Sequence, residues 1–456
     1  MSRGSRGVLL RRFLGLLLAA SLASLGAAAC SKKAATGTDA GGRVTITVNG
    51  MPPATDAINR QNFLDDVAAF EKAHPKIHVV PHEGLMDPQT FPAKLAGGQL
   101  EDVFYVYFTD PANLIARHQV ADITTELADF PVAKQIRPEL MSIFADGSGH
   151  QYGLPWKNYS MGLLYNRALF TKAGLDPNAP PTTWAQVRDA AKKIAALGGG
   201  TVGYGDYSKS NTGGWHFTAE LYSLGGAIAR QDGGVWKAAF NDAAGRQVLQ
   251  QLHDMRWSDN SMGSRQLLEY ADLLQMMGAG KLGMYVATGD NIPNIVNQYK
   301  GDFNDYGLAP MPGGQGTLAG GDGYMFNAKA TPAQITAGLT WLTYQHINPD
   351  KIASDNARAA KDKLPVGLPQ PNIWTGEAEQ KWTDATAKYA NVPQQNYQAF
   401  LSATSIPVRL EPPSAQQIYA VLDTAMQAVL TDRNADIGRL LGDAEKQVNS
   451  ILATVK

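Results

Sequence analysis

The sequence predicts an α/β protein, and two observations support this prediction. Between residues 44 and 107, β-rich runs alternate with helical runs in the order strand, helix, strand, helix, strand. Such alternation is typical of a parallel sheet whose strands are joined by helices. In addition, 44% of the 456 residues are hydrophobic and 18% are charged, which is enough apolar content for packed cores. A chain of this length predicts two or three domains.

The first five elements follow from local residue patterns. The predicted elements are a strand at 44–48, a helix at 58–70, a strand at 77–80, a short helix at 91–95 and a strand at 103–107. The strands are rich in β-branched and aromatic residues, whereas the first helix carries apolar residues at helical spacing. Pro75 ends that helix, because proline cannot continue the hydrogen-bond ladder.

Later helices are predicted from their first residues. Thr183, Thr331 and Ser414 each stand three residues before a glutamine, which is the capping-box pattern. The spaced glycines Gly198, Gly200 and Gly203 match the spacing of a dinucleotide-binding loop. They follow a helix instead of a strand, so we expect a glycine cap and turn there.

Composition excludes several classes of protein. The 40 basic and 41 acidic side chains give a net charge of −1, without the excess of positive charge expected of a nucleic-acid binder. Eight histidines and one cysteine cannot form a disulfide scaffold or a cysteine-rich metal site. His74, His78 and His82 are spaced by four, but Pro75 interrupts the helix that would align them. We expect no metal, no cofactor and no enzymatic activity.

The N-terminal segment predicts export. Four arginines precede an apolar run that ends in small residues before Cys30, and the run is too short for a membrane span. Residues 25–30 (LGAAAC) resemble a bacterial lipobox, in which the cysteine is lipidated and becomes the mature N-terminus. The resemblance implies a signal peptide at 1–29, lipidation of Cys30, and a tether at 30–42 that holds the protein outside the cytoplasm on the cell membrane. The export route, general or twin-arginine, stays open.

Aromatic and polar side chains recur together where predicted strands or turns end. These groups are Tyr105, Tyr107, Thr109 and Asp110; Trp156, Lys157, Asn158 and Tyr159; Trp215 and His216 after Gly213-Gly214; and Thr288, Asp290 and Asn291. Ligands of open α/β sheets bind beyond the carboxyl ends of the strands. Aromatic rings can cover the C–H face of a sugar, while Asp and Asn bind its hydroxyls. Each residue alone is equally compatible with core packing or a solvated surface, so the prediction depends on their recurrence.

Residues 152–197 carry a family resemblance. Tyr152-Gly153-Leu154-Pro155, Tyr165-Asn166, Leu169-Phe170, Ala173-Gly174-Leu175 and Pro181-Thr182-Thr183-Trp184 resemble the central signature of bacterial extracellular solute-binding proteins of the sugar-binding group, relatives of maltose-binding protein. Further matches extend the resemblance over residues 43–456. It implies two α/β lobes joined by a hinge around a ligand cleft. Lobe one would comprise 43–153 and 324–372, and lobe two 154–322 and 375–456.

The resemblance also implies function and site residues. A monomeric lipoprotein would capture a mono- or oligosaccharide, a glycoside or a polyol, close around it, and deliver it to the permease subunits of an ABC importer. By position, Tyr107, Asp110 and Trp215 match ligand-binding segments of the family. Asp290 stands where relatives often have tryptophan. Asp322 would contact the ligand or cap a turn, and Arg409 would lie at the rim of the cleft. Trp156, Asn158 and Asn291 complete the predicted set.

Two alternatives stay open. The same fold could bind a non-sugar solute such as a peptide, a polyamine or a glycerophosphodiester. An exported carbohydrate-active enzyme would need two carboxylates converging on one bond at roughly 5–9.5 Å, which a sequence cannot show. Asn49 to Pro53 lack the charged pair of some maltose binders, so maltose itself is not implied. The sequence specifies neither the sugar nor its length and linkage.

Overall fold

A computed structural model describes residues 37–38, 41–87, 90–403 and 405–455. The predicted signal peptide and Cys30 lie outside the described residues. From Gly37 onward the chain forms one compact unit. Gly37 and Thr38 fall within the predicted tether, and Thr38 forms an antiparallel bridge with Val44.

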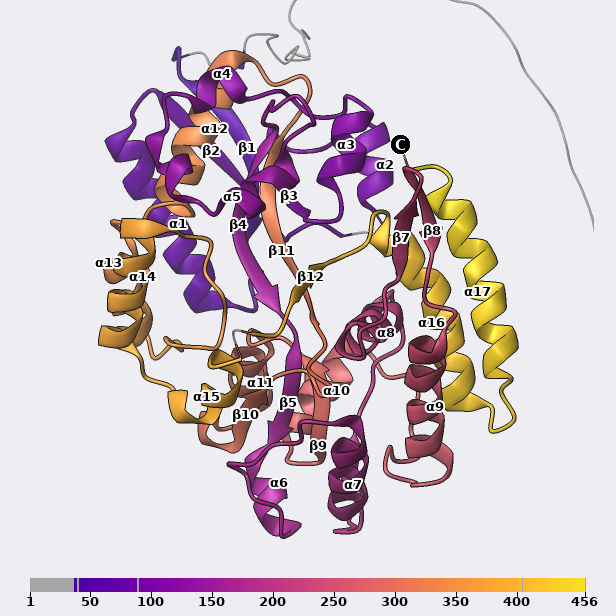
Figure 1. The fold of residues 1–456 in the computed structure, drawn as a ribbon. Coiled ribbons are helices and arrows are strands. Elements are labelled where there is room, and N and C mark those ends of the chain that lie inside the picture. Colours follow the sequence, from indigo (N-terminus) through magenta and orange to yellow (C-terminus); the bar gives the residue numbers. More distant parts are fainter. Residues whose placement is uncertain (1–36, 39–40, 88–89, 404, 456) are drawn as a thin grey trace, which may run out of the picture. The chain divides into compact units, whose positions relative to one another are not determined.

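The first sheet contains three strands of the predicted parallel arrangement. Its strands are β1 (Val44–Met51), β2 (Ile77–Glu83), β3 (Val103–Tyr107), β4 (Gly153–Ser160), β11 (Thr317–Phe326) and β12 (Val408–Leu410), in the order β12-β11-β3-β1-β2 with β4 beside β11 (Figure 1). β1 is parallel to β2 and β3, as predicted. β11 is antiparallel to β3 and β4, so the complete sheet is mixed.

Helices surround this sheet and share its core. They are α1 (Ala57–Ala73), α2 (Phe91–Ala96), α3 (Pro111–Ala116), α4 (Thr124–Leu127), α5 (Pro138–Met141), α12 (Pro332–Gln345), α13 (Ile352–Lys361) and α14 (Gly376–Tyr389), with 3₁₀ turns η1 (Pro131–Gln135) and η2 (Ser142–Phe144). The core centres on Phe70, Phe104 and Trp341. The Phe70 and Trp341 rings meet edge to face at 5.2 Å, an arrangement that aromatic quadrupoles favour.

The second sheet is buried on both faces. Its order is β10-β5-β9-β6, with β10 (Tyr306–Ala309), β5 (Gly162–Asn166), β9 (Leu282–Ala287) and β6 (Val202–Tyr204). Leu163 and Val286 belong to one apolar cluster and Leu164 and Tyr285 to another, because successive side chains point to opposite faces. All residues of β5, β6, β9 and β10 are therefore buried.

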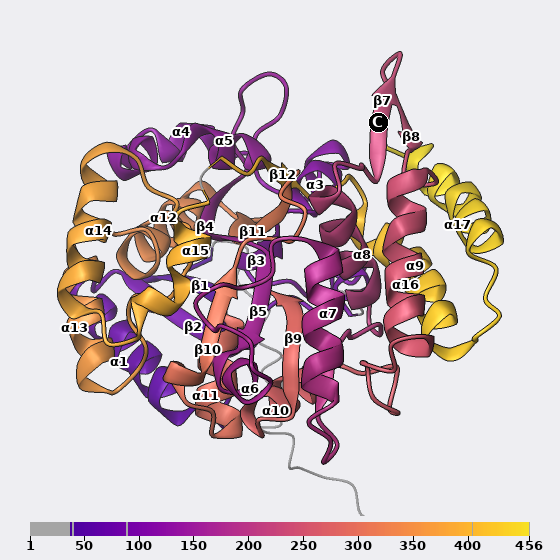
Figure 2. The same ribbon diagram turned by 60° about the horizontal axis from the view of Figure 1, so that its bottom comes forward.

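Helices cover both faces of this second sheet (Figure 2). One cluster includes α6 (Arg167–Lys172), α7 (Trp184–Ala195), α8 (Thr212–Ser223), α9 (Ala243–Trp257), α16 (Ala415–Thr431) and α17 (Ile437–Leu452). The other includes α10 (Tyr270–Gly278), α11 (Asn291–Tyr299), η3 (Phe303–Asp305), η4 (Gln394–Tyr397) and α15 (Gln398–Leu401). A hairpin of β7 (Ala229–Asp232) and β8 (Val235–Ala238) packs beside α17.

The chain crosses between the two sheets at several points. β4 continues through Met161 into β5, and residues 310–316 lead from β10 to β11. α14 was predicted for lobe two, but its Ala378 belongs to the core of the first sheet. Glu379 of the same helix pairs with Arg137 at 2.5 Å.

Two of the three predicted capping boxes are confirmed. Thr183 and Thr331 each accept from the backbone N–H of a glutamine whose side chain returns the bond. The prediction for Ser414 is wrong, because its backbone is left-handed (φ 56°) instead of extended and its side chain does not cap the helix. The predicted glycine turn is confirmed, since Gly198 to Gly200 all have positive φ after α7 ends.

Gly214 lies in the first turn of α8, where the sequence suggested a glycine turn. A Cβ atom on Gly214 would come within 2.3 Å of the Tyr419 Cα atom, so α8 and α16 touch backbone to backbone. Close approach of two helices at this point requires a residue without a side chain.

We therefore expect Gly214→Ala to lower the free energy of unfolding by about 1–3 kcal/mol through overpacking. Gly442 in α17 is the matched control, because nothing lies within 4 Å of a Cβ placed there. Gly442→Ala should raise the free energy of unfolding by about 0.5–1 kcal/mol. Urea unfolding measures both, and equal effects of the two substitutions would contradict the packing argument.

Candidate functional site

A cavity of about 530 Å³ lies where strand ends of both sheets meet. Leu85 and Tyr107 line it from the ends of β2 and β3, and Tyr207 and Thr288 line it just beyond β6 and β9. All four strands present their carboxyl ends to the cavity. This is the position at which open α/β sheets bind ligands.

Aromatic side chains form much of the cavity wall. They are Tyr105, Tyr107, Tyr159, Tyr207, Trp215, Tyr270 and Tyr419. The rings of Tyr159 and Trp215 meet edge to face, with centroids 5.9 Å apart. Tyr207 lines the cavity although only 1% of its surface is exposed. Flat apolar faces and hydroxyl groups are thus presented together.

Asp322 enters the cavity from the middle of β11. It stands opposite Tyr107 in β3 and Lys157 in β4, and only 5% of its surface is exposed. The Lys157 ammonium lies 3.3 Å from its carboxylate. Burial raises the pKa of Asp322, although Lys157 and the Tyr105 hydroxyl oppose that shift. Asp322 is not in a turn, so its predicted alternative as a turn cap is wrong.

Glu411 and Asp290 supply two further carboxylates. The Tyr419 hydroxyl donates to Glu411 at 3.0 Å, and burial raises the pKa of Glu411 to about 8. Asp290 accepts a hydrogen bond from the Thr288 hydroxyl and another, at 3.4 Å, from the Asn291 amide. Asn291 is itself held by a hydrogen bond of 3.0 Å from the Tyr285 hydroxyl.

Trp215 is positioned from beneath by α16. The Asp423 carboxylate accepts from the backbone N–H groups of Asn211 and Gly214, each at 2.8 Å. These bonds satisfy free donors at the start of α8, directly before Trp215. Burial raises the pKa of Asp423 to about 6. Next to Trp215, His216 is fully buried and bonds to Asp206, so α8 is fixed on both sides.

The structure brings five of the nine predicted site residues together. Tyr107, Trp215, Asp290, Asn291 and Asp322 line the cavity. The other four, Asp110, Trp156, Asn158 and Arg409, are not among its lining residues.

The alternation of β4 separates Trp156 and Asn158 from the cavity. Lys157 and Tyr159 line it, and Asn158 pairs with Gly321, whose absent side chain would meet Phe108 outside the cavity. A bulge opposite Asp322 and Gly323 accommodates Trp156 as an extra residue. Its ring packs 4.5 Å from that of His346 instead of reaching the cavity.

Asp110 and Arg409 perform local structural roles. Asp110 precedes α3 and accepts from the Tyr107 backbone N–H at 3.0 Å, and burial raises its pKa to about 7. It therefore holds the end of β3 beneath Tyr107. Arg409 donates to the Gly226 carbonyl at 2.6 Å and lies over the Tyr222 ring. It fixes the chain after α8.

Several lining residues were missed by the predicted set. They are Lys157, Tyr159, Tyr207, Tyr270, Glu411, Gln416 and Tyr419. Alternation along β4 could have identified Lys157 and Tyr159 once one face of the strand was known. Glu411 and Tyr419 come from the last tenth of the chain, where no strand-end pattern marks them.

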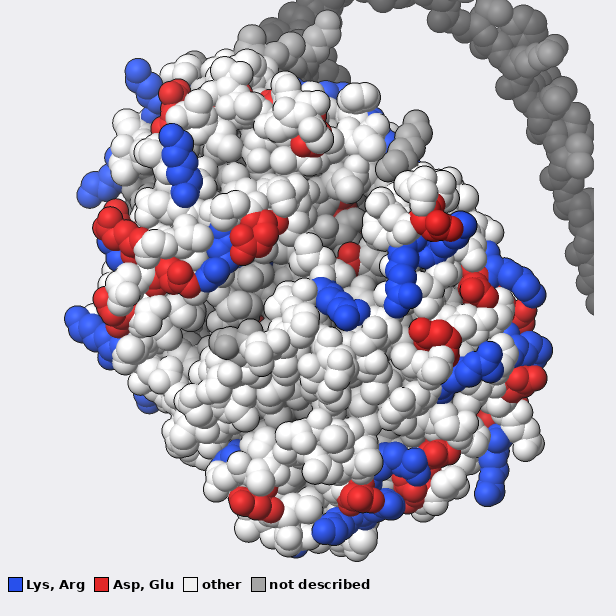
Figure 3. All heavy atoms as spheres, viewed as in Figure 1, with Lys and Arg blue, Asp and Glu red and all other residues white. Residues whose placement is uncertain are grey.

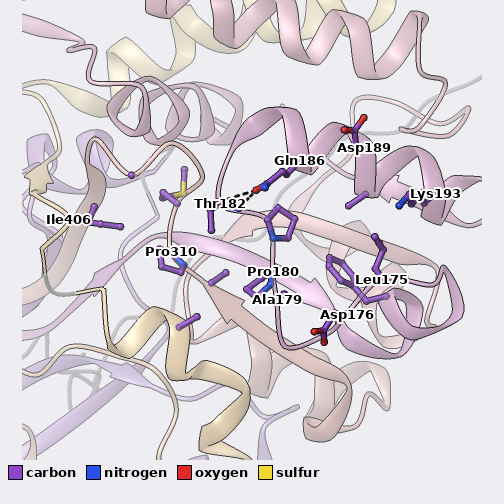
Figure 4. Close-up of a pocket in the computed structure, with 17 residues that line it drawn as sticks. Leu175, Asp176, Ala179, Pro180, Thr182, Gln186, Asp189, Lys193, Pro310 and Ile406 are labelled. Carbon is purple, nitrogen blue, oxygen red and sulfur yellow. Dashed lines mark hydrogen bonds between the residues drawn. The ribbon is translucent and has the colours of Figure 1, made fainter.

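A larger pocket of about 780 Å³ lies elsewhere, lined by parts of α6, α7 and residues near Pro310 (Figure 4). Its polar groups are already used locally. Gln186 accepts from Thr182 and Thr183 as part of the α7 cap, and Asp189 pairs with Lys192 at 2.9 Å. The aromatic cavity therefore remains the better candidate despite its smaller volume.

Charge on one face of the molecule is gathered at the sides. In Figure 3, Lys, Arg, Asp and Glu side chains lie over α13 and α14 and over α9 and α17, whereas the middle of that face is mostly uncharged. Both signs are interspersed there, which agrees with the near-zero net charge.

A family model described as bacterial extracellular solute-binding protein matches residues 56–345, which is more than half of the chain. The chain belongs to this family. It is thus a solute-binding protein that works outside the cytoplasm, as predicted. No helix among residues 37–38, 41–87, 90–403 and 405–455 is long and apolar enough to span a membrane.

Curated relatives match only part of this chain. A binding protein of Brucella abortus (strain 2308) is 28% identical over 170 residues, which cover 36% of this chain and 39% of the relative. The sn-glycerol-3-phosphate-binding periplasmic protein of Salmonella typhimurium is 29% identical over 137 residues, covering 28% and 31%. The chain thus spans less than two fifths of the length of these relatives.

Solved structures match nearly the whole fold. A solute-binding protein of an ABC transporter from Thermotoga lettingae, bound with α-D-tagatose, gives a TM-score of 0.69 at 21% identity, over 90% of this chain and 99% of that one. The GacH receptor of Streptomyces glaucescens, solved unliganded and with acarbose, gives 0.68 at 19% identity, over 90% and 99%. UgpB of Mycobacterium tuberculosis in complex with glycerophosphocholine gives a TM-score of 0.68 at 16% identity, over 90% of this chain and 98% of that one. The predicted two-lobed α/β fold is confirmed.

The raised pKa of Glu411 makes stability depend on pH. Its folded value of about 8 exceeds the unfolded value of about 4.5, so the native state holds the proton more tightly. The stabilisation is complete below about pH 4.5 and is lost as the pH rises to about 8. We expect Glu411→Gln to reduce this pH-dependent fall in the free energy of unfolding by on the order of 1 kcal/mol. The effect stays this small because the carboxyl group is partly open to the cavity, where solvent screens its charge.

Urea unfolding between pH 5 and 8.5 measures the effect. Asp110 and Asp423 titrate in both proteins, so the difference between the two curves isolates Glu411. Glu377 in α14 has a side chain 77% exposed, and Glu377→Gln should leave the pH dependence unchanged. Parallel curves for wild type and Glu411→Gln would contradict the prediction.

Proposed function

We propose that this protein captures a carbohydrate outside the cytoplasmic membrane and delivers it unaltered to the permease of an ABC importer. One observation supports it above others: a cavity between strand ends of two sheets combines seven aromatic side chains with carboxylates and hydroxyls. Aromatic faces suit the C–H surface of a sugar, and acceptors suit its hydroxyl groups. Two structural neighbours are described with tagatose and acarbose, which agrees with this class.

Transport requires that binding change the shape of the protein. The cavity takes Tyr107 and Asp322 from the first sheet and Trp215 and Asp290 from the second. A ligand that contacts both sides binds the closed form more tightly than the open form and so shifts the population toward closure. We place the two lobes around these sheets, with α14 in lobe one, so that the last crossing lies near residue 390.

A phosphate-bearing solute is the second candidate, because a relative of partial length is named for sn-glycerol 3-phosphate. The lining residues disfavour it. Three carboxylates and a single lysine line the cavity, and that lysine already faces Asp322. A phosphate would meet like charge from Asp290 without a second cation. An enzymatic role is also disfavoured, since family membership alone accounts for the cavity.

Membrane attachment is the remaining part of the proposal. Cys30 follows the small residues of the predicted signal peptide, and lipidation there would hold a monomeric protein beside its permease. A single acyl chain binds membranes only marginally, and several chains anchor firmly.

Trp215 provides a direct test of the sugar site. We expect Trp215→Ala to weaken binding of its sugar at least tenfold, about 1.4 kcal/mol or more, because a stacking face is lost. Isothermal titration and thermal shifts with glucose, tagatose, maltose and cellobiose measure this. A sugar at 100 times its dissociation constant should stabilise the wild type by about 2.7 kcal/mol.

Trp236 in β8 is the matched control, because it is also half-buried but does not line the cavity. Trp236→Ala should leave sugar affinity within about threefold of wild type. Circular dichroism checks that both variants fold. Unchanged sugar affinity in folded Trp215→Ala would remove Trp215 from the site, and a panel in which only phosphates bind would refute the carbohydrate proposal.

Lipidation predicts a clear change of location. In a bacterial host, wild-type protein should incorporate a radiolabelled fatty acid and sediment with the membrane fraction. Cys30→Ser should abolish both, because the sequence contains no other cysteine. Labelled or membrane-bound Cys30→Ser protein would contradict the proposed anchor without affecting the proposed ligand.

A further inference from the structure

The cavity has an excess of negative charge at its ligand-facing surface. Asp290, Asp322 and Glu411 line it, and Lys157 is the only basic side chain among its lining residues. The three carboxylates come from different elements, namely the start of α11, the middle of β11 and the segment after β12. All three line the same cavity as Tyr159, and their charges add to the effect of burial in raising the pKa of its hydroxyl.

The single lysine compensates one carboxylate. Its ammonium lies 3.3 Å from Asp322 and 4.7 Å from the centre of the Trp156 ring. The partners of Glu411 and Asp290 are neutral: Tyr419 donates to the first, and Thr288 and Asn291 donate to the second. Two carboxyl groups, those of Asp290 and Glu411, therefore face the cavity without a cation beside them, and the missing cation agrees with the raised pKa of Glu411, about 8. Such groups are costly to bury unless a positive charge accompanies them.

The aromatic wall lies beside these uncompensated carboxylates. Tyr159, Tyr207 and Tyr270 line the same cavity as Asp290. Tyr207 lines the cavity with only 1% of its surface exposed. An aromatic face attracts a cation through its quadrupole, and a hydroxyl can accept from one. The hydroxyl of a neutral sugar would satisfy the hydrogen-bond acceptors of these carboxyl groups but leave their negative charge uncompensated.

We propose that this cavity selects a carbohydrate that carries a protonated amine, an amino sugar or amino glycoside, over its neutral and anionic analogues. The inference rests on the proposed function, because it narrows the solute class of the same site. A primary ammonium donates three hydrogen bonds, which suits the Asp290 carboxylate, and its positive charge would lower the raised pKa of Glu411 and so favour a second acceptor. A quaternary ammonium could contact the rings but could donate to neither carboxylate.

Matched sugars test the selection by charge. Calorimetry at pH 7 would compare three sets, each made of a neutral sugar, its amine and its N-acetylated amine. The sets are glucose, glucosamine and N-acetylglucosamine; galactose, galactosamine and N-acetylgalactosamine; and cellobiose, the chitosan disaccharide and N,N′-diacetylchitobiose. In each set only the amine bears a charge. We expect the amine to bind at least tenfold more tightly than both neutral analogues in at least one set. Its affinity should fall as NaCl rises from 50 to 500 mM, because salt screens the attraction.

Carboxylate variants locate the selection. Asp290→Asn should weaken binding of the amine at least tenfold more than it weakens binding of the neutral analogue. Glu411→Gln is the second variant, in case the first fails to fold, with the same expectation. Asp232 in β7 is the matched control, because its side chain is 74% exposed and does not line the cavity. Asp232→Asn should leave both affinities unchanged.

The outcomes separate this inference from the proposed function. If neutral sugars bind as tightly as their amines throughout, the charge selection is overturned and the carbohydrate function stands. If glycerophosphocholine binds and no amino sugar does, the selection is likewise overturned, in favour of a quaternary ammonium. If no sugar with or without an amine binds, the proposed function fails, and the inference fails with it.

Discussion

The close pairing of β4 with β11 is the constraint on which the candidate site depends. It exists because glycines occupy positions 320, 321 and 323 of β11. A Cβ atom there would come within 2.3 Å of the Tyr159 hydroxyl, 2.5 Å of the Lys157 carbonyl oxygen, and 2.3 Å of the Phe144 ring. A side chain at 321 or 323 would meet a backbone oxygen of β4 and push the strands apart, and one at 320 would displace the Tyr159 ring. Asp322 is the residue within this run that does carry a side chain, and it points into the cavity.

This pairing also couples the two sheets. β4 leads into β5 and β10 leads into β11, so both strands of the pair continue into the second sheet. Tyr159 lies at that junction and meets Trp215 of α8 edge to face. A movement of one sheet relative to the other must therefore pass through the strands that present Lys157, Tyr159 and Asp322. The ligand site and the connection between the sheets are built from the same residues.

Much of the fold followed from the sequence, because local patterns determine local structure. The strands predicted at 44–48, 77–80 and 103–107 correspond to β1, β2 and β3, and they and two capping boxes were predicted from propensity and spacing alone. The antiparallel arrangement of β11 was not, since the glycines that allow close strand pairing are also typical of turns. Ser414 shows the same limit: its sequence context fits a capping box, but the chain enters α16 with a left-handed backbone.

The site was harder to predict than the fold, because it depends on side-chain direction. Trp156 and Asn158 are neighbours of Lys157 and Tyr159 in sequence, yet only the latter two line the cavity. Strand alternation turns Asn158 away, and a bulge that no residue pattern predicts accommodates Trp156. Glu411 lies far from every strand-end group in sequence and enters the cavity only because β12 pairs with β11. Long-range pairing, unlike helix capping, leaves no short signal in the chain.

Burying the carboxyl groups of Asp322 and Glu411 in the cavity wall costs free energy of folding. Burial raises the pKa of both Asp322 and Glu411, so each favours its neutral form more than it would in water. Apolar residues of the same size would pack there without that cost. Asp322 and Glu411 contact few groups that need them for folding, since Lys157 is half-exposed and Tyr419 is held by α16. Hydrogen-bond donors and a positive charge on a bound ligand would offset this cost.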